Sequence, residues 1–117
     1  MKTFKTQAAQ GDLLIRRISS LPKNAVKAKS DNGNFVVAHS ETGHHHIVAE
    51  RPNVAYFTTD DPMISYLQVV EATDETEVLI EHLRSFDTHE SIVVSPGIYE
   101  VRRQREYTPE GWRKVAD

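Results

Sequence analysis

The sequence predicts a mainly all-β fold, a small antiparallel β-barrel or sandwich of about seven short strands. Short segments rich in β-branched and aromatic residues recur along the chain, and turn-forming pairs such as Asn32-Gly33 and Pro96-Gly97 separate them. No internal repeat or Ser/Gly-rich linker divides the chain. Its 117 residues suffice for one modest core, so we expect a single domain over 1–117, with 108–117 as an irregular C-terminal tail.

Six segments have the composition expected of strands, with turn signals between them. The polar link SETG (40–43) joins two of these segments into one hairpin, and Pro96-Gly97 joins the last two into a second hairpin. The expected strands cover 11–18, 35–39, 44–50, 54–58, 91–95 and 98–107.

Two further segments, 63–72 and 77–86, are ambiguous between strand and helix. In the second, Val78, His82 and Phe86 fall at helical spacing, whereas Val78, Ile80 and His82 alternate as in a strand. We therefore keep one short helix around 77–86 as an alternative to a strand.

Composition excludes several classes of protein and site. The chain has no cysteine, so it forms neither disulfides nor thiolate metal sites. No apolar run approaches the roughly 20 residues that span a bilayer, and the N-terminus lacks a signal-peptide pattern. We expect a cytoplasmic protein without membrane contact.

Charge is unevenly distributed around a net value of −3. Residues 61–97 contain eight Asp/Glu against one Lys/Arg, a net −7, whereas the flanking segments are mildly basic. This pattern fits either charge complementarity between neighbouring strands or an acidic surface that docks a protein partner.

The segment SETGHHHIVAE (40–50) contains the strongest functional signal. A hairpin centred on Glu41-Thr42 would pair His39 with His44 and Val37 with His46, and side chains alternate between faces along a strand. His45 then faces the other way. One face would carry Phe35, Val37, His39, His44, His46, Val48 and Glu50.

Imidazoles gathered in this way are typical of a divalent metal site. First-row metals such as zinc, manganese or iron bind two or three neutral histidines together with a carboxylate or water. We expect His44 and His46 as ligands with His89 or His39, and Glu50 or Glu41 as the carboxylate. The alternative is that these histidines are exposed or serve only as hydrogen-bonding groups.

Two resemblances bear on the same residues. The spacing His44-x-His46-x-x-x-Glu50 resembles the first metal-binding motif of the cupins, which are small β-barrels, although no histidine follows the later SPG (95–97). The segments QGDLLIRRI, AHSETGHHHIV, HESIVVSPGIYEVRRQREY and PEGWRKVAD resemble a family of small uncharacterised bacterial and phage-associated proteins. That second resemblance implies that His44, His46 and His89 are family positions, and it implies no chemistry.

The C-terminal segment VRRQREYTPEGWRK suggests a nucleic-acid surface as a further alternative. Arg102, Arg103, Arg105 and Tyr107 combine cations with a stacking surface, as in small barrels that bind single strands. Alternation along a strand would place Arg102 on one face and Arg103, Arg105 and Tyr107 on the other, and an ion-paired surface explains the same residues.

Three functions therefore compete. The first is a non-enzymatic accessory or interaction module with a protein partner, the second a metal-binding barrel, and the third a nucleic-acid-binding barrel. No phosphate loop, nucleophile elbow or zinc-protease motif is present, so no reaction is assigned. Pairing of exposed strands would make a homodimer.

Overall fold

The structure is a computed structural model. It describes residues 3–10, 12–38, 46–72, 77–82, 91–103, 105–108 and 111–114, with backbone alone at 38, 82, 105–108 and 111–114. Within these ranges no helix is long and apolar enough to cross a membrane.

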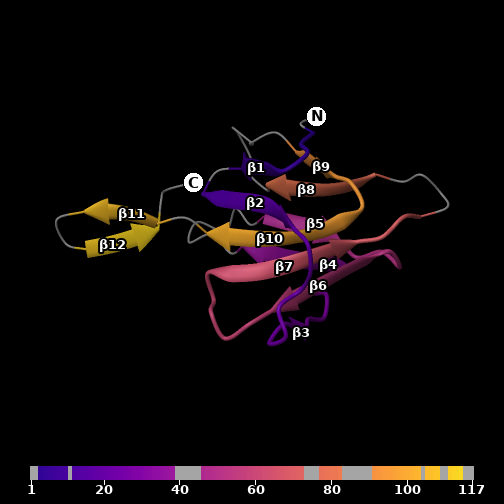
Figure 1. The fold of residues 1–117 in the computed structure, drawn as a ribbon, viewed down its shortest axis with the longest axis horizontal. Helices are drawn as coiled ribbons and strands as arrows, with labels where there is room; N and C mark the ends of the chain where they lie inside the picture. The colour runs from indigo at the N-terminus through magenta and orange to yellow at the C-terminus, as the bar shows by residue number, and fades with distance from the viewer. Residues whose placement is uncertain are drawn as a thin grey trace.

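The described strands form three antiparallel sheets (Figure 1). The largest has the order β1 (Gln7–Gln10), β2 (Leu13–Ile18), β10 (Gly97–Arg103), β7 (Ile64–Val69), β6 (Val54–Thr58) and β3 (Val26–Lys27). A four-stranded sheet has the order β4 (Asn34–Ala38), β5 (His46–Ala49), β8 (Val78–His82) and β9 (Ile92–Val94). The third is a hairpin of β11 (Arg105–Thr108) and β12 (Gly111–Lys114).

The two larger sheets pack face to face around one hydrophobic core. Side chains alternate between core and surface along the strands, so every second residue is buried, as in β7 and β9. The Phe35 and Tyr56 rings meet across the sheets with centroids 5.8 Å apart. The all-β prediction is confirmed, and the form is a sandwich, because strand pairing does not close either sheet into a barrel.

The predicted hairpin around the histidine segment forms, with one change of register. Phe35 pairs with Val48 as expected, but a β-bulge follows Val36 and places Ala38 opposite His46. The predicted pairing of Val37 with His46 is therefore wrong. Both side chains are nonetheless buried.

The predicted hairpin at Pro96-Gly97 is wrong. β9 pairs with β8 in the four-stranded sheet, whereas β10 pairs with β2 and β7 in the six-stranded sheet. The Pro-Gly pair therefore carries the chain from one layer to the other. Residues 98–107 also divide between two sheets, with β10 ending at Arg103 and β11 beginning at Arg105.

Each of the two ambiguous segments contains a strand, over Ile64–Val69 and Val78–His82. β7 pairs with β6 and β10, and β8 pairs with β5 and β9, so the helical alternative is wrong over 78–82. Residues 83–86 lie outside the described ranges. Residues 111–114, expected in an irregular tail, pair with β11 as β12.

Candidate functional site

A buried set of polar side chains lies between the two sheets. β1 alternates so that Ala8 and Gln10 face the core, and Gln10 is 2% exposed. Asp12 belongs to the two-residue link between β1 and β2, since Gln10 pairs with Leu13, and it is 3% exposed. His46 begins β5 in the opposite sheet and is 1% exposed. Buried polar groups of this kind are retained where they bind one another or a ligand.

Gln10 fixes the orientation of the His46 ring. The Gln10 Nε2 atom donates to the carbonyl oxygen of Ile80 at 3.0 Å, so its Oε1 atom is the acceptor that faces His46 Nδ1 at 2.8 Å. An acceptor at Oε1 requires that Nδ1 carry the proton. The other ring nitrogen, Nε2, lies 3.4 Å from Asp12 Oδ1.

Arg103 lies on the other side of the Asp12 carboxylate. Its Nη2 atom is 4.0 Å from Asp12 Oδ2, and the Arg103 side chain is 12% exposed. The carboxylate therefore lies between an imidazole and a guanidinium, with one oxygen toward each. A guanidinium in this position orients a buried carboxylate and offsets part of its desolvation cost.

This arrangement defines a position for a cation. With the proton on Nδ1, the lone pair of His46 Nε2 faces Asp12 Oδ1 at 3.4 Å. An imidazole nitrogen and a carboxylate oxygen are both ligands that divalent metals such as zinc accept. Histidines that bind metals usually donate their second ring N–H to an oxygen acceptor, as His46 does to Gln10.

The structure describes two of the predicted metal ligands, His46 and Glu50, and they lie in different places. His46 is in the buried set, whereas Glu50 lies just beyond β5, is exposed, and accepts a hydrogen bond from Ser30 Oγ at 2.8 Å. Four residues of extended chain span roughly 13 Å, so the structure does not bring Glu50 to His46.

The remaining predicted ligands, His39, His44 and His89, lie outside the described residues, as do Glu41 and His45. In the part of the chain that is described, no three histidine and carboxylate side chains form a group that could hold a metal ion. The Cα partner of His46 in β8 is His82, of which the backbone is described.

Sequence reasoning missed Gln10, Asp12 and Arg103 as members of this set. Asp12 falls in the segment 11–18 that we expect as a strand, but it lies in a turn, and a turn residue gives no sign in the sequence that its carboxylate is buried. No local sequence signal marks Gln10, because the segment Gln-Ala-Ala-Gln has no strand-forming residue and becomes a strand by pairing with β2.

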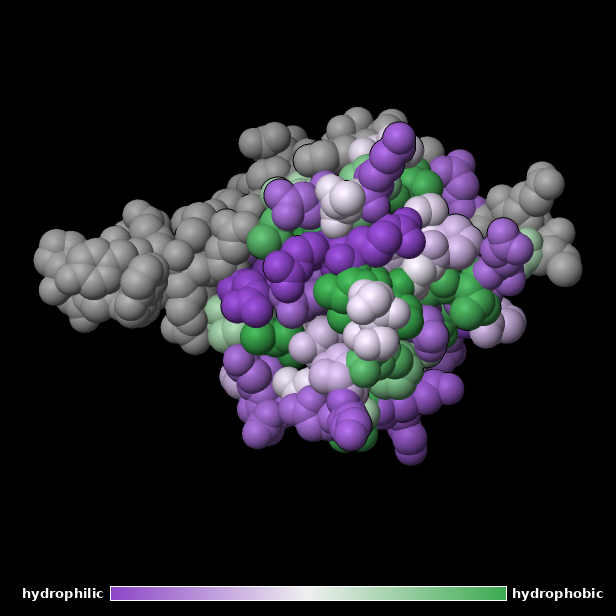
Figure 2. Space-filling view, in the orientation of Figure 1, coloured by the Kyte–Doolittle hydropathy of each residue, from purple (hydrophilic) through white to green (hydrophobic). Residues whose placement is uncertain are grey.

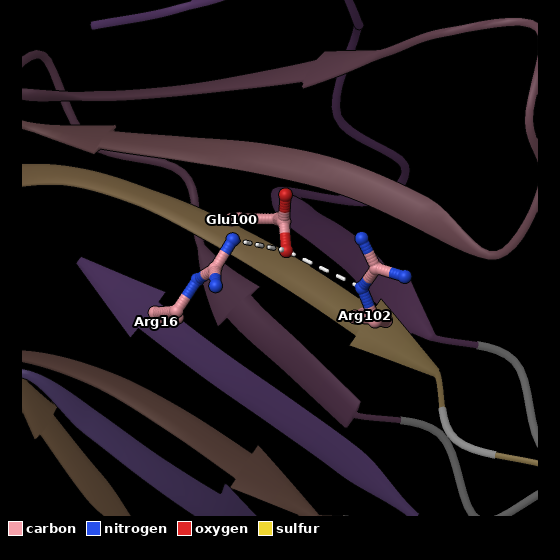
Figure 3. A network of polar contacts seen from close by, with 3 residues as sticks. All are labelled: Arg16, Glu100 and Arg102. Carbon is pink, nitrogen blue, oxygen red and sulfur yellow. Dashed lines mark hydrogen bonds and ion pairs between the residues drawn. The ribbon is translucent and has the colours of Figure 1, made fainter. Parts of the chain in front are cut away.

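Of the nucleic-acid candidates, Arg102 and Arg103 lie on opposite faces of β10, as the predicted alternation of side chains requires. Arg102 lies on the outer face of the six-stranded sheet, where its Nε atom and Arg16 Nη2 both contact Glu100 Oε1, at 3.3 and 3.4 Å (Figure 3). Figure 2 shows this face, on which hydrophilic and apolar side chains are interspersed. Arg103 turns inward to Asp12. Arg105 and Tyr107 are described by backbone alone, in β11.

A family model described as "Domain of unknown function (DUF8820)" matches residues 9–104. The chain belongs to the DUF8820 family. No curated protein and no solved structure shows a significant match.

The DUF8820 match covers the buried polar set completely. It begins immediately before Gln10 and ends immediately after Arg103, so Asp12 and His46 also lie inside it. The β11–β12 hairpin, with two of the nucleic-acid candidates, lies beyond its end. The interior polar set is therefore part of the family domain.

Proposed function

We propose that this domain binds a divalent metal ion between its two sheets, with His46 Nε2 and Asp12 Oδ1 as two of the ligands. The observation that carries the proposal is the 3.4 Å separation of these two atoms, combined with a proton held on His46 Nδ1 by Gln10. Two ligands of a tetrahedral zinc ion, each about 2.0–2.1 Å from the metal, lie roughly 3.3–3.4 Å apart. The two described groups are thus spaced as ligands of one ion.

His44 and His89 are proposed as the remaining ligands. His44 precedes His46 by two residues, the spacing at which neighbouring side chains of a strand share a face. With two or three histidines and one carboxylate, the ligand set suits zinc, manganese or iron.

The burial of the described ligands supports a structural role for the metal. Catalytic sites keep one position open to water or substrate, whereas structural sites are closed by protein ligands. His46 and Asp12 are 1% and 3% exposed and come from opposite sheets. A metal bound by both would tie the β1–β2 turn to β5 and stabilise the sandwich.

Metal analysis of untagged protein tests the proposal. We expect close to one equivalent of zinc, manganese or iron per chain after incubation with each metal and removal of the excess. His46→Gln and Asp12→Asn should each lose the metal, as should His44→Ala and His89→Ala. Glu50→Gln is the matched control, because Glu50 binds Ser30 at the surface and should leave the metal content unchanged.

Two further measurements test for the metal independently of elemental analysis. Cobalt in place of the native metal should give the intense visible absorption of tetrahedral Co²⁺, and a chelator should lower the Tm of the wild-type protein but not of His46→Gln. Wild-type protein without metal after all three incubations, with a Tm indifferent to chelator, would overturn the proposal.

A further inference from the structure

Two hollows of opposite charge lie at one end of the sandwich. The first, of about 410 Å³, lies where β7 ends and β8 begins, at the right of Figure 1. Val69, Val78 and Val94 line it, together with Glu71 and Glu77. We call it the acidic hollow. Val70, which also lines it, is 51% exposed and is one of two large apolar side chains so exposed among the described residues.

The second hollow, of about 870 Å³, is lined by three cations. These are Lys27, Lys29 and Arg51, and we call this space the basic hollow. Its one carboxylate, Glu50, accepts a hydrogen bond from Ser30. The other exposed large apolar residue, Val26 at 64%, directly precedes Lys27 in the edge strand β3.

The loop between β5 and β6 joins the two hollows. Arg51 and Pro52 line the basic hollow and Asn53 lines the acidic hollow. Asn53 is fixed to Val70 by two hydrogen bonds, from its Nδ2 to the Val70 carbonyl at 3.0 Å and from the Val70 amide to its own carbonyl at 2.9 Å. Arg51 and Glu77 also line one small space together, so the two hollows are neighbours.

We propose that this end of the sandwich is the interface of a two-fold symmetric homodimer, in which the basic hollow of each copy covers the acidic hollow of the other. A two-fold interface needs a surface that is complementary to itself. Adjacent hollows of opposite charge meet that condition when the axis passes through the loop that separates them. The proposal is independent of the metal site, whose described ligands lie in the interior.

The exposed groups support a second copy as the occupant. Within the described ranges, no ion pair engages Glu71, Glu77, Lys27 or Lys29, so their charges face solvent in one copy. A peptide of one charge would complement one hollow only, whereas a second copy complements both. Burial of Val70, which lines the acidic hollow and is exposed in one copy, would add an apolar contact of the kind that exposed patches provide.

Charge reversal tests the interface directly. By sedimentation, the wild-type protein should show twice the 13.3 kDa mass of one chain and should dissociate toward one chain in high salt. Glu71→Lys with Glu77→Lys should give a monomer, and so should Lys27→Glu with Lys29→Glu. An equimolar mixture of these two double variants should restore the dimer, because both contacts again join opposite charges. Circular dichroism establishes that each variant is folded.

A cysteine cross-link tests the symmetry, since the chain has no native cysteine. Pro52→Cys places a thiol beside the proposed axis, so the same residue of both copies comes close enough for a disulfide. Mild oxidation should cross-link this variant into covalent dimers, whereas the exposed Ser20→Cys variant should stay largely without cross-links.

A wild-type monomer at every concentration would overturn the proposal, and would instead fit the use of edge lysines to prevent association. A mixture of double variants that stays monomeric would do the same. Species larger than a dimer would contradict the two-fold arrangement.

Discussion

Arg17 occupies the space in which a side chain at position 97 would begin. A Cβ atom built on Gly97 would collide with Arg17 Nη1 and lie 3.3 Å from the Tyr99 hydroxyl. The Arg17 guanidinium is held there by the carbonyls of Lys5 and Pro96, by Ser95 Oγ and by the Tyr99 hydroxyl, at 2.8 to 3.0 Å. The corner at which the chain leaves one sheet for the other is therefore built around one arginine and one glycine.

Gly97→Ala should destabilise the fold by about 1–3 kcal/mol, because the new methyl group displaces the Arg17 guanidinium from its partners. The positive φ of 157° adds backbone strain. Denaturant unfolding measures the loss. Gly33→Ala is the control: Gly33 has a φ of 79° but open space around its Cβ, so backbone strain alone should cost about 1 kcal/mol there.

A double-mutant cycle isolates the steric contact at this corner. In an Arg17→Ala background, Gly97→Ala should cost less than it does in the wild type, because the guanidinium that it displaces is absent. Equal costs in both backgrounds would show that the collision with Arg17 is not the cause.

Arg17→Ala should itself cost about 1–3 kcal/mol, whereas Arg16→Ala should cost no more than about 1 kcal/mol. Arg17 makes four hydrogen bonds and lies 5.0 Å from the Tyr99 ring centroid, but Arg16 makes a 3.4 Å contact to Glu100 at the surface. Arg17→Lys should recover little, since a lysine cannot reproduce the planar donor geometry. Comparable unfolding energies for the two alanine variants would refute this ranking.

Tyr56 should make stability sensitive to alkaline pH. Burial raises the pKa of its hydroxyl above 10.0, although the Ser65 side chain and the Arg103 charge act in the opposite direction. The folded state therefore holds this proton more tightly than the unfolded state. Its contribution to stability is complete below pH 10 and is lost as the pH rises through the folded pKa.

Tyr56→Phe should remove that alkaline loss while costing stability at neutral pH. The phenylalanine cannot donate the 3.4 Å hydrogen bond to the Val37 carbonyl, which should cost about 1 kcal/mol. Unfolding midpoints at pH 8 and pH 11 make the comparison, with Tyr66→Phe on the outer face as the control. If the two variants lose stability in parallel between these pH values, Tyr56 is not the source.

Local composition predicted the strands that contain β-branched and aromatic residues. The segments around β2, β4, β5 and β6 were located from that signal, and the pairing of Phe35 with Val48 followed from the position of the turn. β1 was missed because its sequence, Gln-Ala-Ala-Gln, has no strand-forming residue. Pairing with β2 and burial of Ala8 and Gln10 make it a strand, and neither is local information.

Contacts between residues far apart in the sequence determine the features of the fold and the site that local composition could not predict. Pro96-Gly97 signals a turn, but the sheet that each flank joins depends on pairing with distant strands, β8 for β9 and both β2 and β7 for β10. His46 was recognised as a functional candidate, yet its partner Gln10 is 36 residues away and Asp12 lies in a turn. Such partners become visible only when the two sheets are packed together.

Gln10→Leu tests whether the side-chain amide of Gln10, apart from the place of this residue in β1, orients the His46 ring. The substitution removes the donor to the Ile80 carbonyl and the acceptor of the His46 Nδ1 proton, and both of those buried groups would lose this partner. We expect a loss of about 2–3 kcal/mol in unfolding free energy. If a metal binds at His46, its affinity should also fall by about 10–100-fold, because the ring is no longer held in one tautomer.

Gln7→Leu is the matched control, since it makes the same substitution at the other end of β1, where the side chain is exposed. It should change the unfolding free energy by no more than about 0.5 kcal/mol and leave metal titration unaltered. Equal stability of the two variants would mean that the Gln10 amide adds nothing to the fold. A stability loss in Gln10→Leu with unchanged metal affinity would mean that Gln10 supports the sandwich without orienting His46 for a ligand.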